Sequence, residues 1–156
     1  MLSLAKALVL YHSQEYGNTG KMAESVADGL RSGGCDVTLF NTNGGRFDAS
    51  TFPQYACVAF GSPDYYSYVA GGIKTFMDDY YILHTHKGVK GMKEKPYVLF
   101  YSCGGGGRVR EAMIRLFKSV GTQVGEPLGC SGEPSGDVLE KCRAVGRELA
   151  KKSKTR

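Results

Sequence analysis

The chain has 156 residues, of which 42% are hydrophobic and 22% charged, and its 20 basic and 15 acidic residues give a net charge of +5 at pH 7. That length fits one domain, residues 1–156, and buries about two-thirds of the surface that the unfolded chain exposes. No window reaches the roughly 18 apolar residues of a membrane span, and no small-residue cleavage site follows the N-terminal apolar run. We therefore expect a soluble, cytoplasmic protein with no membrane span and no nucleic-acid partner.

Five short β-rich runs alternate along the chain with helical patterns. The runs cover 7–11, 37–40, 57–60, 97–101 and about 123–128. Apolar residues recur at helical spacing over 22–30, 73–81, 109–120 and 138–149. Gly33 and Gly34 form a plausible stop for the first helix. The crossover NTNGGRFDASTFPQY, residues 41–55, is loop-like with at most a short helix, and the basic segment 152–156 is expected to be a frayed tail.

Strands that alternate with helices indicate an α/β fold with a parallel sheet covered on both faces. Ligands bind such sheets beyond the carboxyl ends of the strands, at the point where the strand order reverses. The loops that follow the first, third and fourth strands are therefore the candidates for function. They cover residues 13–19, 62–72 and 102–108, and they are rich in Ser, Gly, Tyr or Asn.

The first of these loops, SQEYGNT, runs from a strand into a helix. The helix start leaves backbone N–H groups unpaired at the positive end of the helix dipole, so an anion is the natural occupant. Ser13 and Thr19 add hydroxyl donors, Asn18 adds an amide, and Gly17 lets the backbone come close. We interpret the loop as a phosphate site, with a simple helix cap and turn as the alternative.

Several phosphate-binding motifs do not match the sequence. A P-loop would need Ser or Thr after Lys21, where Met22 stands, and this turn contains no GxGxxG. ATP, GTP and NAD are therefore disfavoured at this loop. A cysteine phosphatase loop has five residues between its Cys and Arg, whereas four separate Cys103 from Arg108 and six separate it from Arg110.

The cysteines and histidines give little sign of a metal site. The five cysteines contain no CxxC pair, and we interpret them as buried free thiols in a reducing compartment. His84 and His86 form an HxH within a basic stretch, but no further His or Cys lies nearby at ligand spacing. A solvated loop is the favoured interpretation.

Three segments resemble the flavodoxin-like FMN proteins. YHSQEYGNTGKMAESVADGL looks like their phosphate loop and first helix, whose motif is Ser/Thr-x-Thr-Gly-Asn-Thr, and GSPDYYSYVAGGIKTFMDD is similar to their second flavin loop. FYSCGGGG resembles the third loop of a glycine-rich branch that includes the flavodoxin domains of flavodiiron proteins and the quinone-reductase-like flavodoxins. The resemblance spans Ala7 to about Lys151. It implies a flavodoxin-like three-layer sandwich whose five parallel strands have the order 2-1-3-4-5.

The resemblance also implies FMN as the cofactor and assigns a role to each loop. The first loop would hold the phosphate, the second would border the isoalloxazine with Tyr65 or Tyr66 stacked on it, and backbone amides of the third would reach the pyrimidine edge. The implied residues are Ser13, Gln14, Glu15, Tyr16, Gly17, Asn18 and Thr19, then Pro63, Asp64, Tyr65 and Tyr66, and finally Ser102, Cys103, Gly104, Gly105, Gly106 and Gly107. The first loop is one residue longer than usual, so either Gln14 or Glu15 could bulge. The third loop lacks the aromatic residue that many flavodoxins stack on the flavin.

Two functions of different class fit this resemblance, because the flavin chemistry is the same in both. One is an FMN electron carrier that docks on redox proteins, with acidic partners favoured by the charge of +5, which is unusual among flavodoxins that shuttle electrons. The alternative is an NAD(P)H-dependent quinone reductase. The short chain, without the long insertion that quinone-reductase-like relatives use for assembly, favours the carrier. A third hypothesis is a binding domain without flavin. The sequence leaves the oligomeric state open, and a homo-oligomer is one of the alternatives.

Overall fold

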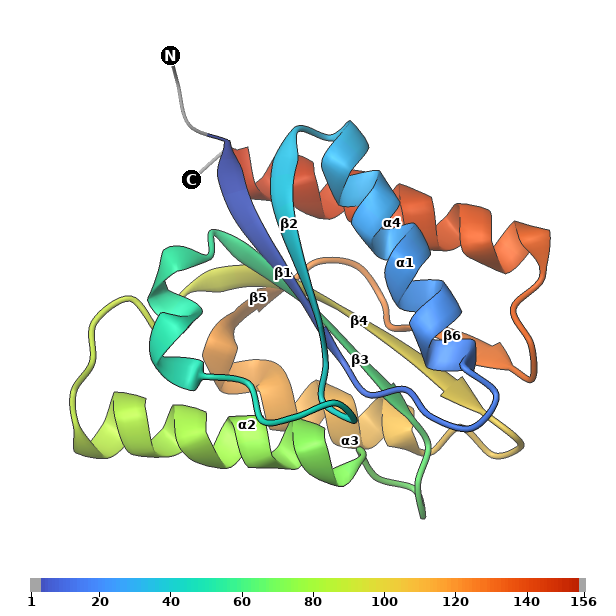
Figure 1. Cartoon of the computed structure of the whole chain (residues 1–156), viewed down its shortest axis with the longest axis horizontal. Helices are drawn as coiled ribbons and strands as arrows, with labels where there is room; N and C mark the ends of the chain where they lie inside the picture. Colours follow the sequence, from blue (N-terminus) through green and yellow to red (C-terminus); the bar gives the residue numbers. More distant parts are fainter. Residues whose placement is uncertain (1–3, 155–156) are drawn as a thin grey trace.

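The computed structural model describes residues 4–154, which build one parallel sheet between two layers of helices (Figure 1). The strands are β1 (Ala5–Tyr11), β2 (Cys35–Asn41), β3 (Cys57–Pro63), β4 (Lys95–Cys103), β5 (Gly121–Gln123) and β6 (Leu128–Ser131). Their order is β2-β1-β3-β4-β5, and β6 also pairs with β4. The predicted α/β class and the strand order 2-1-3-4-5 are confirmed, with β6 as a small addition.

The four long helices are divided equally between the two faces of the sheet. They are α1 (Asn18–Ser32), α2 (Gly71–Tyr81), α3 (Val109–Phe117) and α4 (Gly136–Lys154), and the short helical turns are η1 (Ala49–Gln54), η2 (Ile82–His86) and η3 (Lys118–Val120). α1 and α4 cover one face, whereas α2, α3 and η1 cover the other (Figure 1). No helix among residues 4–154 is long and apolar enough to cross a membrane.

The two faces of the sheet are packed with side chains of different size. Under α2 and α3 the core is aromatic, and the Phe60 and Phe117 rings stack with their centroids 3.9 Å apart. Under α1 and α4 it consists largely of Ala, Val and Cys side chains. Alternate residues of each buried strand supply the two faces, as Leu8 and Val9 do in β1. The continuous apolar strands predicted from the sequence are therefore explained by burial on both sides.

Glycines let α1 and α4 cross in direct backbone contact. A Cβ atom at Gly29 of α1 would overlap the carbonyl oxygen of Arg143, and one at Gly146 of α4 would overlap the carbonyl oxygen of Val26. Because each glycine faces the other helix's backbone, neither overlap could be relieved by a side-chain rotation. This crossing fixes the position of α1, and hence of its N-terminus, over the sheet.

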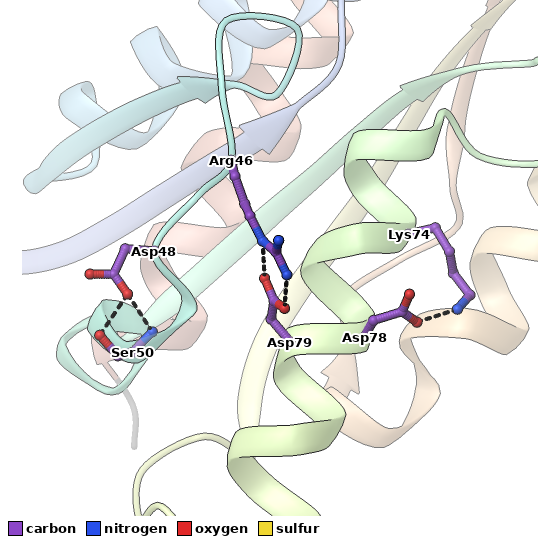
Figure 2. Close-up of polar contacts among 6 residues, drawn as sticks. All are labelled: Arg46, Asp48, Ser50, Lys74, Asp78 and Asp79. Atoms are coloured by element: carbon purple, nitrogen blue, oxygen red, sulfur yellow. Dashed lines mark hydrogen bonds and ion pairs between the residues drawn. The ribbon is translucent and has the colours of Figure 1, made fainter.

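The crossover between β2 and β3 is a loop with one short helical turn, as predicted. Arg46 donates two hydrogen bonds to Asp79 of α2, at 2.9 and 2.6 Å (Figure 2). Asp48 caps η1 by accepting from the backbone N–H and the hydroxyl of Ser50, and these bonds lower the pKa of Asp48 (Figure 2). The crossover is therefore tied to α2 although it contains little regular structure.

The last predicted strand, 123–128, is wrong in its position. Two short strands take its place, β5 ending at Gln123 and β6 beginning at Leu128, and both pair with β4. Between them Gly125 has a φ of +70°, and Pro127 lacks the N–H that a ladder needs. The chain therefore leaves the sheet after Val124, whose N–H still donates to the carbonyl of Tyr97 at 2.7 Å, and returns at Leu128.

Two further expectations change at the ends of helices. The tail expected to fray from residue 152 is helical as far as Lys154, and the Ser153 hydroxyl donates to the carbonyl of Ala150, while residues 155–156 lie outside the described range. His84 and His86 lie on the helical turn η2, which extends α2, rather than in a loop. Gly34, with a φ of +95°, ends the first helix as predicted.

The glycine contact between α1 and α4 gives a test of the packing. We expect Gly29→Ala to lower the free energy of unfolding by about 2 kcal/mol, because overpacking outweighs the ~1 kcal/mol that alanine gains in helix propensity. Urea unfolding measures the change. Gly71→Ala is the matched control, since a Cβ there meets no atom within 4 Å. A Gly29→Ala protein as stable as the control protein would contradict the assigned contact.

Candidate functional site

The loops that follow β1, β3 and β4 meet at the carboxyl edge of the sheet and enclose a cleft of about 290 Å³. The first loop lies where the strand order reverses, because β1 stands between β2 and β3. The lining residues are Gln14, Glu15, Tyr16, Asn18, Thr19, Pro63, Asp64, Tyr65, Ser102, Cys103, Gly104 and Gly132. All but Gly132 are among the residues implied by the sequence.

The predicted residues outside the lining have other positions. Ser13 is buried, and Gly17 lies directly before the start of α1. Tyr66 is fully exposed at the tip of the second loop. Gly105, Gly106 and Gly107 continue the third loop towards α3. Gly132 was missed because it follows β6, and the sequence pattern placed the last strand too early.

The first loop is shaped to present unpaired N–H groups. Gly17, with a φ of +73°, precedes α1 and has no side chain with which to cap the helix. The N–H groups of Asn18 and Thr19 lie in the first turn, where a helix offers them no acceptor. The Gly17 N–H donates to the carbonyl of Gln14 at 3.2 Å, and Glu15 has a φ of +56°. The extra residue of this loop is therefore accommodated by a turn with Glu15 in the left-handed region.

Two buried hydroxyl groups connect the first loop to its surroundings. The Ser13 hydroxyl oxygen accepts the N–H of Gly20 at 3.0 Å, which leaves its own hydrogen available to donate. The Thr19 hydroxyl pairs with that of Ser102 at 2.7 Å and so links the start of α1 to the end of β4. One hydroxyl hydrogen of this pair also remains available to a ligand.

The second loop is a tight turn closed by two backbone hydrogen bonds. The N–H of Tyr65 donates to the carbonyl of Tyr68 at 3.0 Å, and the reverse bond is 3.1 Å long. Tyr66 and Ser67 both have a positive φ, as the two central residues of such a hairpin turn require. The turn therefore directs Tyr65 into the cleft and Tyr66 into solvent.

Asp64 joins this turn to the third loop. One of its carboxylate oxygens accepts the N–H of Ser67 at 2.7 Å, and the other accepts the N–H of Val109, at the start of α3, at 3.2 Å. The N–H of Asp64 donates to the carbonyl of Ser102 at 2.9 Å. Asp64 thus holds the second loop and the third loop together.

The third loop exposes its backbone. A Cβ at Gly104 or Gly105 would meet no atom within 4 Å, so open space lies beside these residues. Gly107 has a φ of +68°, a conformation that glycine adopts without strain. The Cys103 thiol donates to the carbonyl of Gly105 at 3.3 Å, and the Gly132 N–H donates to the carbonyl of Cys103 at 3.0 Å. The loop can present backbone N–H groups to a ligand at close range.

The cleft is polar but holds few charges. Burial, and then the Glu15 carboxylate, raise the pKa of Tyr65 above its ordinary value, so its phenol stays neutral at neutral pH. Within residues 4–154, no group of three or more His, Cys, Asp or Glu side chains could hold a metal ion. A larger cavity, about 670 Å³, lies between α4 and β5 and is lined by the carboxylates of Glu94, Glu126 and Glu148. Lys152 also lines that cavity, which none of the three loops at the carboxyl edge of the sheet borders.

Comparison with known proteins agrees with this geometry. The flavodoxin family profile matches residues 9–146. The chain belongs to the flavodoxin family. It is similar to a solved flavodoxin from the domain Archaea, with a TM-score of 0.80, 25% identity and coverage of 96% of this chain and 99% of that one. The flavodiiron protein from Giardia intestinalis shares the fold, with a TM-score of 0.79 and 24% identity over 96% of this chain and 36% of that one.

A curated relative is a longer protein. The nitric oxide reductase of Moorella thermoacetica is 27% identical over 150 residues, which cover 94% of this chain and 36% of that protein. This chain therefore spans about a third of that relative's length. The part of the reductase that resembles this chain is one segment of a larger whole.

Flavodoxins bind FMN, and the cleft suits this cofactor. Its first loop offers the first-turn N–H groups of α1 and a free hydroxyl hydrogen, which are the donors that a phosphate needs. The second loop offers the ring of Tyr65, and the third offers open backbone beside Gly104 and Gly105. The phosphate and the ring of FMN thus each have a matching set of groups.

The Asp64 contacts lead to a test of how rigidly the cleft is built. We expect Asp64→Ala to speed amide hydrogen exchange at Ser67 at least tenfold, since a hydrogen bond to a charged group contributes about 1.5–3 kcal/mol. Asp48→Ala is the matched control, because Asp48 accepts the N–H of Ser50 in the same way but far from the cleft. It should speed exchange at Ser50 and leave Ser67 unchanged. Unchanged exchange at Ser67 in Asp64→Ala would contradict the hydrogen bond between the Asp64 carboxylate and the N–H of Ser67.

Proposed function

We propose that this chain binds FMN in the cleft between its three loops and acts as an electron carrier. The observation that carries the proposal is the convergence of the first-turn N–H groups of α1, an inward-facing tyrosine and an open glycine loop at the point where the strand order reverses. Family membership over residues 9–146 supports the same conclusion. When bound, FMN supplies electron transfer in steps of one or two electrons.

The residues of the three loops would divide the cofactor between them. The N–H groups of Asn18 and Thr19, with the Ser13 hydroxyl, would donate to the phosphate. Tyr65 lines the cleft whereas Tyr66 does not, so we assign the contact with the ring to Tyr65. The backbone of Gly104–Gly107 would donate to the polar edge of the ring, where reduction adds negative charge.

The net charge favours an acidic redox partner. Lys87, Lys90 and Lys93 are exposed on the loop between η2 and β4, and none forms an ion pair with another residue in the range 4–154. This loop lies at the far end of α2 from the second loop (Figure 1). Such charges act through the field of the whole protein and raise the rate at which an acidic partner arrives. The five free cysteines, four of them buried, support a reducing compartment such as the cytoplasm.

Removal of the hydroxyl donors tests the phosphate assignment. We expect the double variant Ser13→Ala, Thr19→Ala to bind FMN at least tenfold more weakly, from about 1 kcal/mol or more for each charge-assisted hydrogen bond. Fluorescence titration of the apoprotein measures the affinity. Riboflavin, which lacks the phosphate, is the matched ligand and should bind nearly as well to the variant as to the wild type. Equal losses for both ligands would refute the assignment.

Steady-state kinetics separates the carrier from a reductase. As a carrier, the FMN-loaded protein should accept electrons from an acidic redox protein at a rate that falls steeply with added salt, because salt screens charges over about 10 Å at 0.1 M. Direct oxidation of NADH or NADPH should be negligible. If the protein alone turned over NAD(P)H with a soluble quinone at about 1 s⁻¹ or faster, the carrier role would be wrong and the reductase correct.

A further inference from the structure

His12 lies directly before the first loop and makes contacts with three separate segments. It is only 8% exposed. Its Nδ1 is 2.9 Å from the Thr42 hydroxyl, which follows β2, and its Nε2 is 2.7 Å from the side-chain oxygen of Gln14 in the first loop. Its ring meets that of Tyr65 edge to face, with 6.0 Å between centroids. One imidazole therefore joins the first loop, the second loop and the end of β2.

The anchor for these contacts is rigid. The N–H of Thr42 donates to the carbonyl of Tyr11 at 2.8 Å, and the N–H of His12 donates to the carbonyl of Gly61 at 3.1 Å. Thr42 also packs so closely on Gly72 of α2 that a Cβ there would overlap its side chain. Thr42 is thus tied to both the sheet and α2. It holds the imidazole in place, and the imidazole in turn holds Gln14 and Tyr65.

The hydrogen bonds of His12 are satisfied whether or not the ring is charged. With the Gln14 oxygen facing Nε2, this nitrogen carries a hydrogen in both states. In the neutral ring Nδ1 accepts from the Thr42 hydroxyl, and in the charged ring Nδ1 donates to the oxygen of the same hydroxyl, which rotates. A change of charge therefore breaks no contact. Histidine is also the side chain whose charge ordinarily changes between pH 5 and 8.

Charged side chains also stand on the two loops that His12 contacts and on α2. Glu15 stands in the first loop, Asp64 in the second, and Lys74 in α2, where it forms an ion pair within its own helix. Glu15 is exposed, and Asp64 accepts two backbone hydrogen bonds. Tyr65 stays neutral, as its raised pKa requires. His12 is thus a buried group that can add a positive charge next to the first loop.

We propose that His12 is a positioning residue of the flavin site that holds Gln14 and Tyr65 in place and, when protonated, adds a positive charge that strengthens phosphate binding by the first loop. The inference rests on the proposed function for the identity of the anion. Because binding linkage is reciprocal, the bound phosphate must in turn favour the protonated imidazole. Affinity for a phosphate ligand should therefore fall as His12 loses its proton.

The test measures FMN affinity between pH 6 and pH 8 for the wild type, His12→Gln and His12→Ala. The phosphate of FMN titrates in the same range, and His12→Gln retains that effect while it removes the imidazole charge. We divide the dissociation constant for FMN at pH 8 by that at pH 6. We expect this ratio to be roughly threefold or more larger in the wild type than in His12→Gln. At pH 8 His12→Gln should bind nearly as well as the wild type, because an amide retains polar contacts, whereas His12→Ala should bind more weakly. Riboflavin affinity should show no such difference in its pH dependence.

A second measurement needs no variant. The three histidines of the chain can be followed by NMR in the apoprotein, with inorganic phosphate or FMN added. The midpoint of the His12 titration should move to higher pH with either ligand, while His84 and His86, on the distant turn η2, serve as internal controls and should not move.

The possible results separate the two proposals. Identical pH dependence in the wild type and His12→Gln, or a His12 midpoint that neither ligand moves, would overturn the role of His12. A chain that fails to bind FMN would overturn the proposed function, and the titration with inorganic phosphate would still decide the role of His12. If His12→Gln fails to fold, the NMR titration of the wild type decides alone.

Discussion

The position of β1 between β2 and β3 is the constraint on which the site depends. Consecutive strands of a parallel sheet normally advance in one direction, but here the chain goes from β1 to one side and then returns past it to the other. The connections that leave β1 and β3 therefore diverge to opposite faces of the sheet, and a crevice opens beside the loop after β1. The loops after β3 and β4 border this crevice on one side. On the other side the end of β2 supports the loop after β1, because the Asn41 side chain exchanges two hydrogen bonds of 3.0 Å with the backbone of Ser13. The cleft is the space that this reversal leaves.

Close packing between helices and between strands fixes the positions from which the three loops start. On one side, Gly29 and Gly146 bring α1 and α4 into backbone contact, which sets where α1 begins. Within the sheet, Gly61 and Gly129 leave room for the rings of Phe100 and Tyr101 on neighbouring strands. Because these packed elements have little freedom, the loops that end them start from defined positions. That is the arrangement in which a binding site with few charged groups can still be selective.

The cleft is prepared for its ligand mainly through neutral groups. The donors of the first loop are backbone N–H groups and hydroxyls, the second loop is fixed by Asp64, and the third presents backbone. Such groups are oriented before the ligand arrives, so little ordering is needed on binding. The exposed lysines Lys87, Lys90 and Lys93 are not among the residues that line the cleft. His12 contributes to this orientation through its contacts with Thr42, Gln14 and Tyr65.

Periodicity along the chain was sufficient to predict the alternation of strands and helices, because a buried strand and an amphipathic helix each leave a local pattern of apolar residues. The three loops could be located in the same way, since a Gly-rich or Ser-rich segment after a strand is also a local feature. The division of the last strand at Gly125 and Pro127 was not predicted, and neither was the cleft-lining role of Gly132. The inward position of Tyr65, the outward position of Tyr66 and the contacts of His12 with Thr42 and Tyr65 were decided only by the tertiary structure. These features depend on which distant segments become neighbours, and no spacing within a single segment records that.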